Sequence, residues 1–244
     1  MLFCCEHITK SYEGTPVVQD INLDLPRGGI LSLLGPSGVG KTTLFNVLAG
    51  VDSPEAGRVL LEGVDITGKA GLVSYMLQKD LLLPYRTVLD NVILPLVIRG
   101  QSRKQARAYA AEFFPQFGLA GYEDKYPYQI SGGMRQRAAL LRTCMTGCQV
   151  LLLDEPFSAL DAITKMQIHE WYLDLAAAMN LSTIFITHDV DEAVFLSDTV
   201  CILSGKPGTI THQLTIEPGR PRERHFQTSA GFSVYKRTIL DLIR

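Results

Sequence analysis

A glycine-rich segment that follows a short apolar run constrains this chain more than any other feature of its sequence. Residues 30–34 (ILSLL) predict a buried strand, and residues 42–50 predict a helix that ends at Gly50. The segment between them matches the pattern G-x4-G-K-(S/T). Glycines allow backbone N–H groups to turn toward phosphate oxygens, and the start of the helix adds partial positive charge. The predicted phosphate-binding residues are Gly35, Pro36, Ser37, Gly38, Val39, Gly40, Lys41, Thr42 and Thr43.

Charged and hydroxyl side chains near this segment indicate its chemistry. Lys41 would place a positive charge at the β- and γ-phosphates, and Thr42 would offer a hydroxyl to Mg²⁺. Asp154 and Glu155 follow the apolar run 150–153 (VLLL), and ligands of open α/β sheets bind at the carboxyl ends of such strands. Asp154 suits the Mg²⁺ shell, and Glu155 suits a group that orients an attacking water or accepts its proton. The alternative for this pair is a loop acid that caps the next helix.

Strands that alternate with helices predict the fold class. Besides 30–34, strands are predicted at 17–25, 72–77, 150–153, 183–187 and 198–203, and a hairpin or edge strands at 58–66. Helices are predicted at 103–114, 135–143, 162–180, 189–197 and 233–243. This alternation predicts an α/β fold with a mostly parallel sheet between layers of helices. We expect a single domain, 1–244, in which residues 1–84 and 144–210 form the nucleotide-binding core, residues 85–143 a helical subdomain and residues 211–244 a short tail.

Composition excludes several classes of protein. The chain has 244 residues with 23 Lys and Arg against 25 Asp and Glu, and this net charge of −2 argues against nucleic acid as a partner. Its five cysteines are an odd number, which favours reduced thiols. No stretch approaches the ~18 apolar residues that span a bilayer, and the N-terminus does not read as a secretory signal. We therefore expect a soluble chain that reaches a membrane only through a partner.

A second glycine motif makes the prediction more specific. Residues 130–137 (ISGGMRQR) place Ser131, Gly132 and Gly133 at the start of a predicted helix, where their backbone N–H groups would form a second anion site. With the motifs above, and in the same order, the chain resembles the ATPase subunit of an ABC transporter. This resemblance implies a P-loop NTPase core, an N-terminal antiparallel β subdomain and an inserted α-helical subdomain. It also implies ATP and Mg²⁺ as cofactors.

The resemblance assigns roles to further residues. Tyr12 would stack on adenine, although a lone tyrosine can also be a packing residue. Gln78 would contact Mg²⁺ or the attacking water, and Asp161 would lie in the loop that crosses the dimer interface. His188, which follows the predicted strand 183–187, would contact the γ-phosphate and hold Glu155 and the water in line. The implied catalytic residues are Lys41, Glu155 and His188, and the implied Mg²⁺ contacts are Thr42, Gln78 and Asp154.

Partners also follow from the resemblance. Ser131–Gly133 would grip the γ-phosphate held by a second copy of the chain, so that two copies enclose two ATP molecules. The leucine-rich segment after Gln78 would contact a transmembrane permease, although its leucines can also belong to the helical core. An extracytoplasmic solute-binding protein would take part indirectly, and the chain would lie at the cytoplasmic face of the cell membrane. Segments such as 154–165 (DEPFSALDAITK) resemble importers of the nitrate, sulfonate and taurine type, with thiamine-pyrimidine-precursor importers close to them.

Two other functions remain as alternatives. One is a soluble ABC-type ATPase in DNA repair or translation, but the chain has no room for a long coiled coil and carries one phosphate loop rather than two. The other is a nucleotide-binding module without hydrolysis, against which Glu155 and His188 argue.

Overall fold

A six-stranded sheet organises the molecule. In the computed structural model, which describes residues 1–158, 160, 162–222 and 224–243, its strands lie in the order β10-β9-β3-β8-β7-β6. Neighbouring strands run parallel, except that β10 pairs antiparallel with β9. The strands span Ile30–Leu34 (β3), Ser74–Met76 (β6), Val150–Asp154 (β7), Ser182–Ile186 (β8), Thr199–Ser204 (β9) and Thr209–Thr215 (β10). The predicted α/β fold with a mostly parallel sheet is confirmed.

Alternate residues of the central strands face two separate hydrophobic clusters. In β3, Leu31 and Leu33 pack into the cluster that contains helix α1 (Lys41–Leu48). Ile30 and Leu34 pack into the other cluster, with helices α6 (Ala162–Ala178) and α7 (Val190–Leu196). Strands β3, β7 and β8 are buried along their whole length. Burial on both faces explains why these strands are continuous apolar runs in the sequence.

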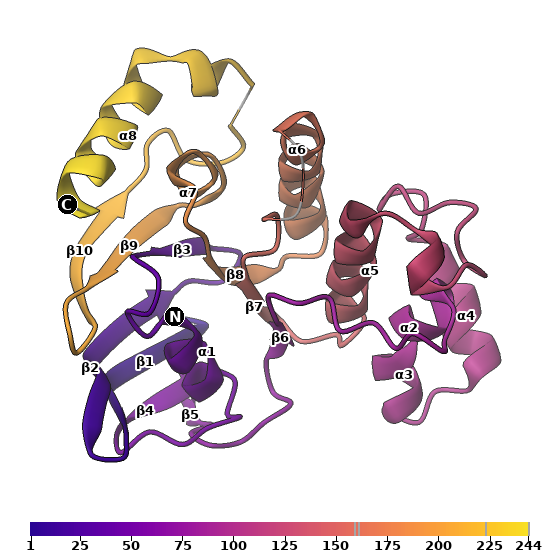
Figure 1. The fold of residues 1–244 in the computed structure, drawn as a ribbon, viewed down its shortest axis with the longest axis horizontal. Helices are drawn as coiled ribbons and strands as arrows, with labels where there is room; N and C mark the ends of the chain where they lie inside the picture. The colour runs from indigo at the N-terminus through magenta and orange to yellow at the C-terminus, as the bar shows by residue number, and fades with distance from the viewer. Residues whose placement is uncertain (159, 161, 223, 244) are drawn as a thin grey trace.

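A smaller antiparallel sheet covers α1 from the other side (Figure 1). Its order is β2-β1-β4-β5, and its strands span Phe3–Tyr12 (β1), Thr15–Leu25 (β2), Ala56–Leu61 (β4) and Val64–Asp65 (β5). Strand β1 is absent from the sequence-based prediction. Its pairing shifts register between Cys5 and Ile8, and the bulge that contains His7, at φ 53°, resets the alternation of buried residues.

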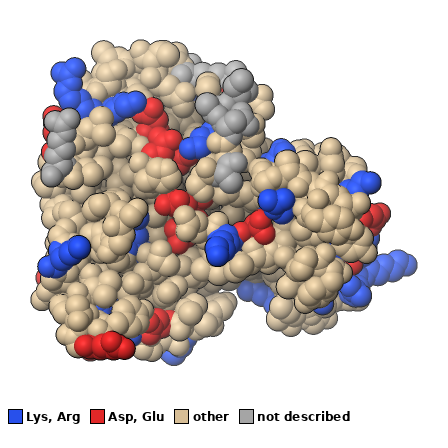
Figure 2. Space-filling view, viewed as in Figure 1, with Lys and Arg blue, Asp and Glu red and all other residues tan. Residues whose placement is uncertain are grey.

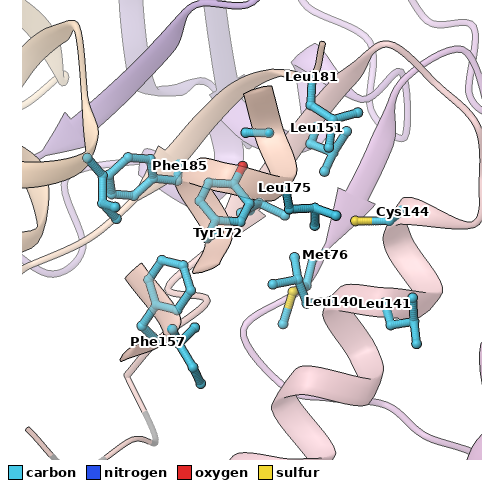
Figure 3. Close-up of a cluster of buried hydrophobic side chains, with 14 of the residues drawn as sticks. Met76, Leu140, Leu141, Cys144, Leu151, Phe157, Tyr172, Leu175, Leu181 and Phe185 are labelled. Carbon is cyan, nitrogen blue, oxygen red and sulfur yellow. The ribbon is translucent and has the colours of Figure 1, made fainter. Parts of the chain in front are cut away.

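The helical subdomain projects from the β6 edge of the main sheet (Figure 1). It contains α2 (Val88–Val92), α3 (Leu94–Ile98), α4 (Arg103–Ala111), the 3-10 turn η1 (Pro127–Gln129) and α5 (Gly132–Cys144). Figure 3 shows where α5 joins the core: Leu140 and Cys144 of α5 lie near Met76 of β6, within the same hydrophobic cluster as Tyr172 of α6. Helix α5, whose start carries the second glycine motif, is therefore held by packing of its C-terminal half against the core.

The C-terminal part of the chain contributes more to the main sheet and the core than the short tail predicted from the sequence. Strand β10 crosses the predicted boundary at residue 210 and forms one edge of the main sheet. Arg222, only 6% exposed, donates to the carbonyl oxygens of Val194, Phe195 and Ser197 at the end of α7. Helix α8 (Ala230–Ile243) then contributes Phe232 and Ile239 to the core. In the part of the chain that the structure describes, no helix is both long and apolar enough to pass through a bilayer.

Candidate functional site

A cleft of about 320 Å³ lies at the carboxyl ends of β3, β7 and β8. It collects residues from the glycine-rich loop, from the acidic pair and from the end of β6. The lining residues are Val17, Ser37, Gly38, Gly40, Lys41, Thr42, Thr43, Gln78, Asp154, Glu155 and Ile186. The structure therefore brings together most of the residues that the sequence assigns to phosphate and Mg²⁺.

Two glycines of the loop are required by their surroundings. A Cβ on Gly35 would lie 2.3 Å from the backbone oxygen of Leu203, so β9 approaches too closely for any side chain. A Cβ on Gly40 would lie 2.6 Å from Val18, and Gly40 also has a φ of 106°. Glycine adopts this left-handed conformation with little strain. The close approach of the main sheet and of β2 thus leaves room only for a tight turn of the loop just before α1.

Lys41 lies on the wall of the cleft with its ammonium directed at the loop. Its Nζ donates to the carbonyl oxygens of Gly35 at 2.7 Å and Pro36 at 2.8 Å. An ammonium has three N–H donors, so one remains for a phosphate oxygen. Burial lowers the pKa of Lys41, while the nearby charges of Glu155 and Asp154 oppose that change.

Thr42 and Asp154 form a pair of hard oxygen ligands. The Thr42 hydroxyl donates to Asp154 Oδ2 at 3.2 Å, and Asp154 is only 5% exposed. Burial raises the pKa of Asp154, and the hydrogen bond from Thr42 opposes that rise. A bound divalent cation would favour the ionised carboxylate. A hydroxyl and a carboxylate beside a phosphate loop suit Mg²⁺, which commonly takes few protein ligands together with phosphate oxygens.

Glu155 lies between two side chains that the sequence assigned to the same reaction. Its Oε2 accepts a hydrogen bond from Gln78 Nε2 at 3.1 Å, and its Oε1 lies 3.3 Å from His188 Nδ1. The backbone of Glu155 is left-handed, with a φ of 49°, and its N–H donates to the carbonyl oxygen of Ile186. This backbone bond ties the turn after β7 to β8, the strand that precedes His188.

Tyr12 lies beside the cleft rather than in its lining. Its hydroxyl donates to Asp52 Oδ2 at 2.8 Å, and Lys10 Nζ lies 5.2 Å from the centre of its ring. The Asp52 hydrogen bond raises the pKa of Tyr12, whereas contact with Thr43, which lines the cleft, acts in the opposite direction. The residue is 44% exposed. A half-exposed ring fixed at its hydroxyl is suited to receive a flat base.

Ser131–Gly133 are not among the residues that line the cleft. The Ser131 hydroxyl accepts from the Met134 N–H as the N-cap of α5. Gly132 lines a separate hollow with Gln78, on the side of the helical subdomain. Within one chain, the second glycine motif and the phosphate loop therefore do not form a single site. Asp161, the remaining predicted site residue, lies outside the described residues.

Further contacts around the site have no motif in the sequence. Gln136 is a polar residue only 6% exposed, and its side-chain amide donates to the backbone oxygen of Glu155 at 3.1 Å. Its burial on α5 becomes visible only when the subdomains are assembled. On the described residues of the face in Figure 2, Lys and Arg are scattered, whereas several Asp and Glu side chains gather near the middle.

Comparisons with known proteins agree with this geometry. Residues 18–158 match the ABC transporter family. The chain is 40% identical to the taurine import ATP-binding protein TauB of Yersinia pestis, over 86% of this chain and 82% of that protein. It is also 40% identical to the formylaminopyrimidine import ATP-binding protein ThiZ of Halalkalibacterium halodurans, over 84% and 81%.

Comparison of the fold with solved structures agrees with the sequence comparisons. The dimeric, post-hydrolysis structure of the ATP-binding cassette MJ0796 with ADP and Pi superposes with a TM-score of 0.80 at 25% identity, over 89% of this chain and 100% of that one. The chain therefore belongs to the ABC transporter family, as an ATPase subunit with the fold of an ATP-binding cassette.

Proposed function

We propose that this chain uses MgATP to drive a membrane importer of a small solute. One observation carries the proposal: Glu155 lies between Gln78 and His188 at the mouth of the phosphate-loop cleft. A chain that only held a nucleotide would not need a carboxylate supported from two strand ends. Import is supported by the relatives, whose names describe ATP-binding proteins of import systems.

The residues of the cleft divide the reaction between them. The loop N–H groups and Lys41 bind phosphate oxygens. Thr42 and Asp154 would hold Mg²⁺, with Gln78 nearby, and the ion would neutralise phosphate charge. Glu155 orients the attacking water and accepts its proton, and His188 keeps the Glu155 carboxylate in position. Tyr12 stacks on adenine, and its hydrogen bond to Asp52 fixes the ring.

A second copy of the chain completes the site. Ser131–Gly133 lie outside the cleft that holds Lys41, so they are free to meet the nucleotide of another copy. Two head-to-tail copies related by a two-fold axis would then form two equal sites. Closure would depend on ATP, because its phosphates would contact both chains. Asp161 is proposed to lie at the same interface.

The segment after Gln78 is proposed to contact the permease. Leu81 is 52% exposed and Tyr85 is 72% exposed, whereas Leu82 is buried in the core of the helical subdomain. The leucine-rich run thus serves both interpretations offered by the sequence, since one leucine packs inside and another faces out. Because Gln78 contacts Glu155, movement of this segment would reach the catalytic carboxylate directly. The chain would then lie at the cytoplasmic face of the membrane, with a solute-binding protein acting on the far side.

The solute is proposed to be of the nitrate, sulfonate and taurine type or a pyrimidine precursor of thiamine. Relatives of equal identity are named for taurine and for formylaminopyrimidine, so identity alone does not choose between these classes. Uptake of labelled nitrate, taurine, an alkanesulfonate and formylaminopyrimidine by cells lacking the gene, with and without a restored copy, tests the choice. If cells lacking the gene take up all of these solutes as well as cells with the restored copy, the proposed solute classes are contradicted.

The composite site can be tested by mixing two inactive variants. Lys41→Ala damages the phosphate loop, and Ser131→Arg blocks the second glycine motif. Each variant alone should be inactive, because both of its sites are damaged. A mixed dimer would contain one site with both defects and one intact site, so the mixture should regain ATPase activity. The control replaces Ser131→Arg with the double variant Lys41→Ala/Ser131→Arg, which cannot form an intact site. Equal inactivity of both mixtures, with exchange of subunits shown by cross-linking, would contradict the two-chain site.

A further inference from the structure

A largely buried cluster of polar and ionisable residues lies behind the turn that carries His188. It is formed by Glu192 on α7, Lys165 and His169 on α6, and the two neighbours of His188, Thr187 and Asp189. None of these side chains lines the nucleotide cleft. Glu192 is only 3% exposed, so its carboxylate depends on these partners for stabilisation.

Contacts with both of its oxygens hold the Glu192 carboxylate. Oε2 accepts from the Thr187 hydroxyl at 2.6 Å, and Oε1 lies 2.8 Å from Lys165 Nζ and 3.7 Å from His169 Nε2. Burial alone would raise the pKa of Glu192. The contacts with His169, Lys165 and Thr187 outweigh burial and lower its pKa to about 2. The carboxylate is therefore ionised and fixed in the folded chain.

The same contacts fix both residues that flank His188. The Thr187 hydroxyl, which donates to Glu192, also accepts from the Asp189 N–H at 3.0 Å. The Asp189 carboxylate caps α7 and lies 3.2 Å from Lys165 Nζ. The His188 side chain itself is 64% exposed and reaches Glu155 at 3.3 Å. An exposed imidazole must take its position mainly from the backbone that carries it, and here the backbone is clamped on both sides.

The cluster also connects this turn to the segment that follows Glu155. Lys165 and His169 lie one turn apart on α6. The ring of Phe157, two residues after Glu155, packs edge-on against His169 with 4.9 Å between ring centres. His169 therefore contacts both Phe157, in the segment that follows Glu155, and Glu192, which binds the turn that carries His188.

We propose that Glu192 is a positioning residue for hydrolysis, which holds His188 in contact with Glu155 by binding Thr187 and anchoring that turn to α6. The proposal rests on the ATPase function proposed above. Its alternative is a purely structural ion pair, whose loss would reduce the amount of folded protein without acting through His188. Geometry favours the positioning role, because Glu192 bonds directly to the residue next to His188.

A double-mutant cycle separates the two roles. ATPase rates are measured for the wild type, Glu192→Gln, His188→Ala and the double variant, with long single-turnover reactions for the slow ones. Glu192→Gln should lower kcat about tenfold, with KM for MgATP within about twofold. In the His188→Ala background it should cause no further loss, because the group it positions is gone. An equal loss in both backgrounds would overturn the proposal. A wild type that does not hydrolyse ATP would instead reject the proposed function.

Thr187 variants keep the test valid if Glu192→Gln does not fold. Thr187→Val removes the hydroxyl that joins Glu192 to the turn and should reproduce the loss of kcat, whereas Thr187→Ser should restore it. The matched control is Thr183→Val, on β8, the strand that ends just before Thr187, which removes the buried hydroxyl that contacts the Tyr172 hydroxyl at 2.6 Å. It should cost stability but leave kcat per folded molecule unchanged. Equal kcat losses for Thr187→Val and Thr183→Val would overturn the proposal.

Discussion

The side-chain amide of Gln136 donates a 3.1 Å hydrogen bond to the backbone oxygen of Glu155. This bond joins α5, whose start carries Ser131–Gly133, to the turn that carries the proposed catalytic carboxylate. The backbone of Glu155 is left-handed, which is uncommon for a residue with a side chain and needs support from its surroundings. Gln136 supplies that support from the helical subdomain.

Replacing Gln136 with leucine should therefore slow hydrolysis more than it weakens binding. Leucine has a similar size but donates no hydrogen bond, so Glu155 loses a constraint while the phosphate loop is untouched. We expect kcat to fall about tenfold and the ATP dissociation constant to stay within about twofold. Stopped-flow binding and steady-state ATPase assays give the two values. Gln105→Leu, on α4, is the control, and an unchanged kcat for Gln136→Leu would contradict this role.

Replacing Glu155 with glutamine should trap the nucleotide-bound state. An amide keeps the shape of the side chain but cannot accept a proton from water, so turnover should fall by about 10²- to 10⁴-fold. Binding should persist, because Lys41, Thr42 and the loop remain in place. Size-exclusion chromatography with ATP should show a dimer that the wild type loses as it hydrolyses ATP. Normal turnover in this variant would remove Glu155 from the catalytic role.

Tyr12 should affect recognition of the base but not of the phosphates. Tyr12→Ala removes the stacking surface and should weaken ATP binding by about 1–3 kcal/mol, the usual contribution of an aromatic ring to a stacked base. Tyr12→Phe loses only the hydrogen bond to Asp52 and should bind ATP more tightly than Tyr12→Ala. Titration calorimetry with inorganic tripolyphosphate is the control, because that ligand has no base. If Tyr12→Ala weakens both ligands equally, the ring does not act on adenine.

The cysteines should divide into two groups by their reactivity. Cys5, Cys144 and Cys201 are buried, and burial raises the pKa of each thiol to about 12. At neutral pH these three should resist maleimide in the folded chain. Cys4 and Cys148 are partly exposed and should react first. Mass spectrometry of labelled peptides gives the order, and unfolded protein should label at all five positions. Rapid native labelling of Cys144 would contradict its burial.

The sequence predicts best those strands whose surroundings are uniform. Residues 30–34, 150–153 and 183–187 were predicted because strands buried on both faces have no polar side to interrupt them. Strand β1 was missed because its bulge breaks the alternation of buried residues. Strand β10 was missed because it is an antiparallel edge strand in which His212 and Gln213 are exposed.

The site shows the same division between local and long-range information. Lys41, Asp154 and Glu155 were predicted because each belongs to a local motif at the end of a strand. Gln136 and Glu192 were missed because they meet partners that are distant in the sequence only when the chain is folded. Gln136 bonds to a residue 19 positions away in another subdomain, and Glu192 contacts Lys165 on α6. A buried polar residue on a helix leaves no periodic signal that distinguishes it from a surface one.

Glu192 should make the stability of the folded chain sensitive to acid. Its pKa is about 2 when folded, below the ordinary value of 4.5, so it stabilises the fold at pH values above about 4.5. This contribution corresponds to about 3 kcal/mol at neutral pH and is lost as the pH falls from 4.5 toward 2, with about 2 kcal/mol gone by pH 3. The loss occurs because protonation gives up the contacts with Lys165, His169 and Thr187.

Chemical denaturation at pH 6 and pH 3 measures this difference. The free energy of unfolding should fall by about 2 kcal/mol more in the wild type than in Glu192→Gln, because the amide does not titrate. Glu112→Gln, at an exposed position at the end of α4, is the matched control and should keep the acid sensitivity of the wild type. An identical pH dependence in the wild type and Glu192→Gln would show that the buried carboxylate is not held in its ionised form by Lys165 and Thr187, and the anchor proposed for the His188 turn would then lack its charge.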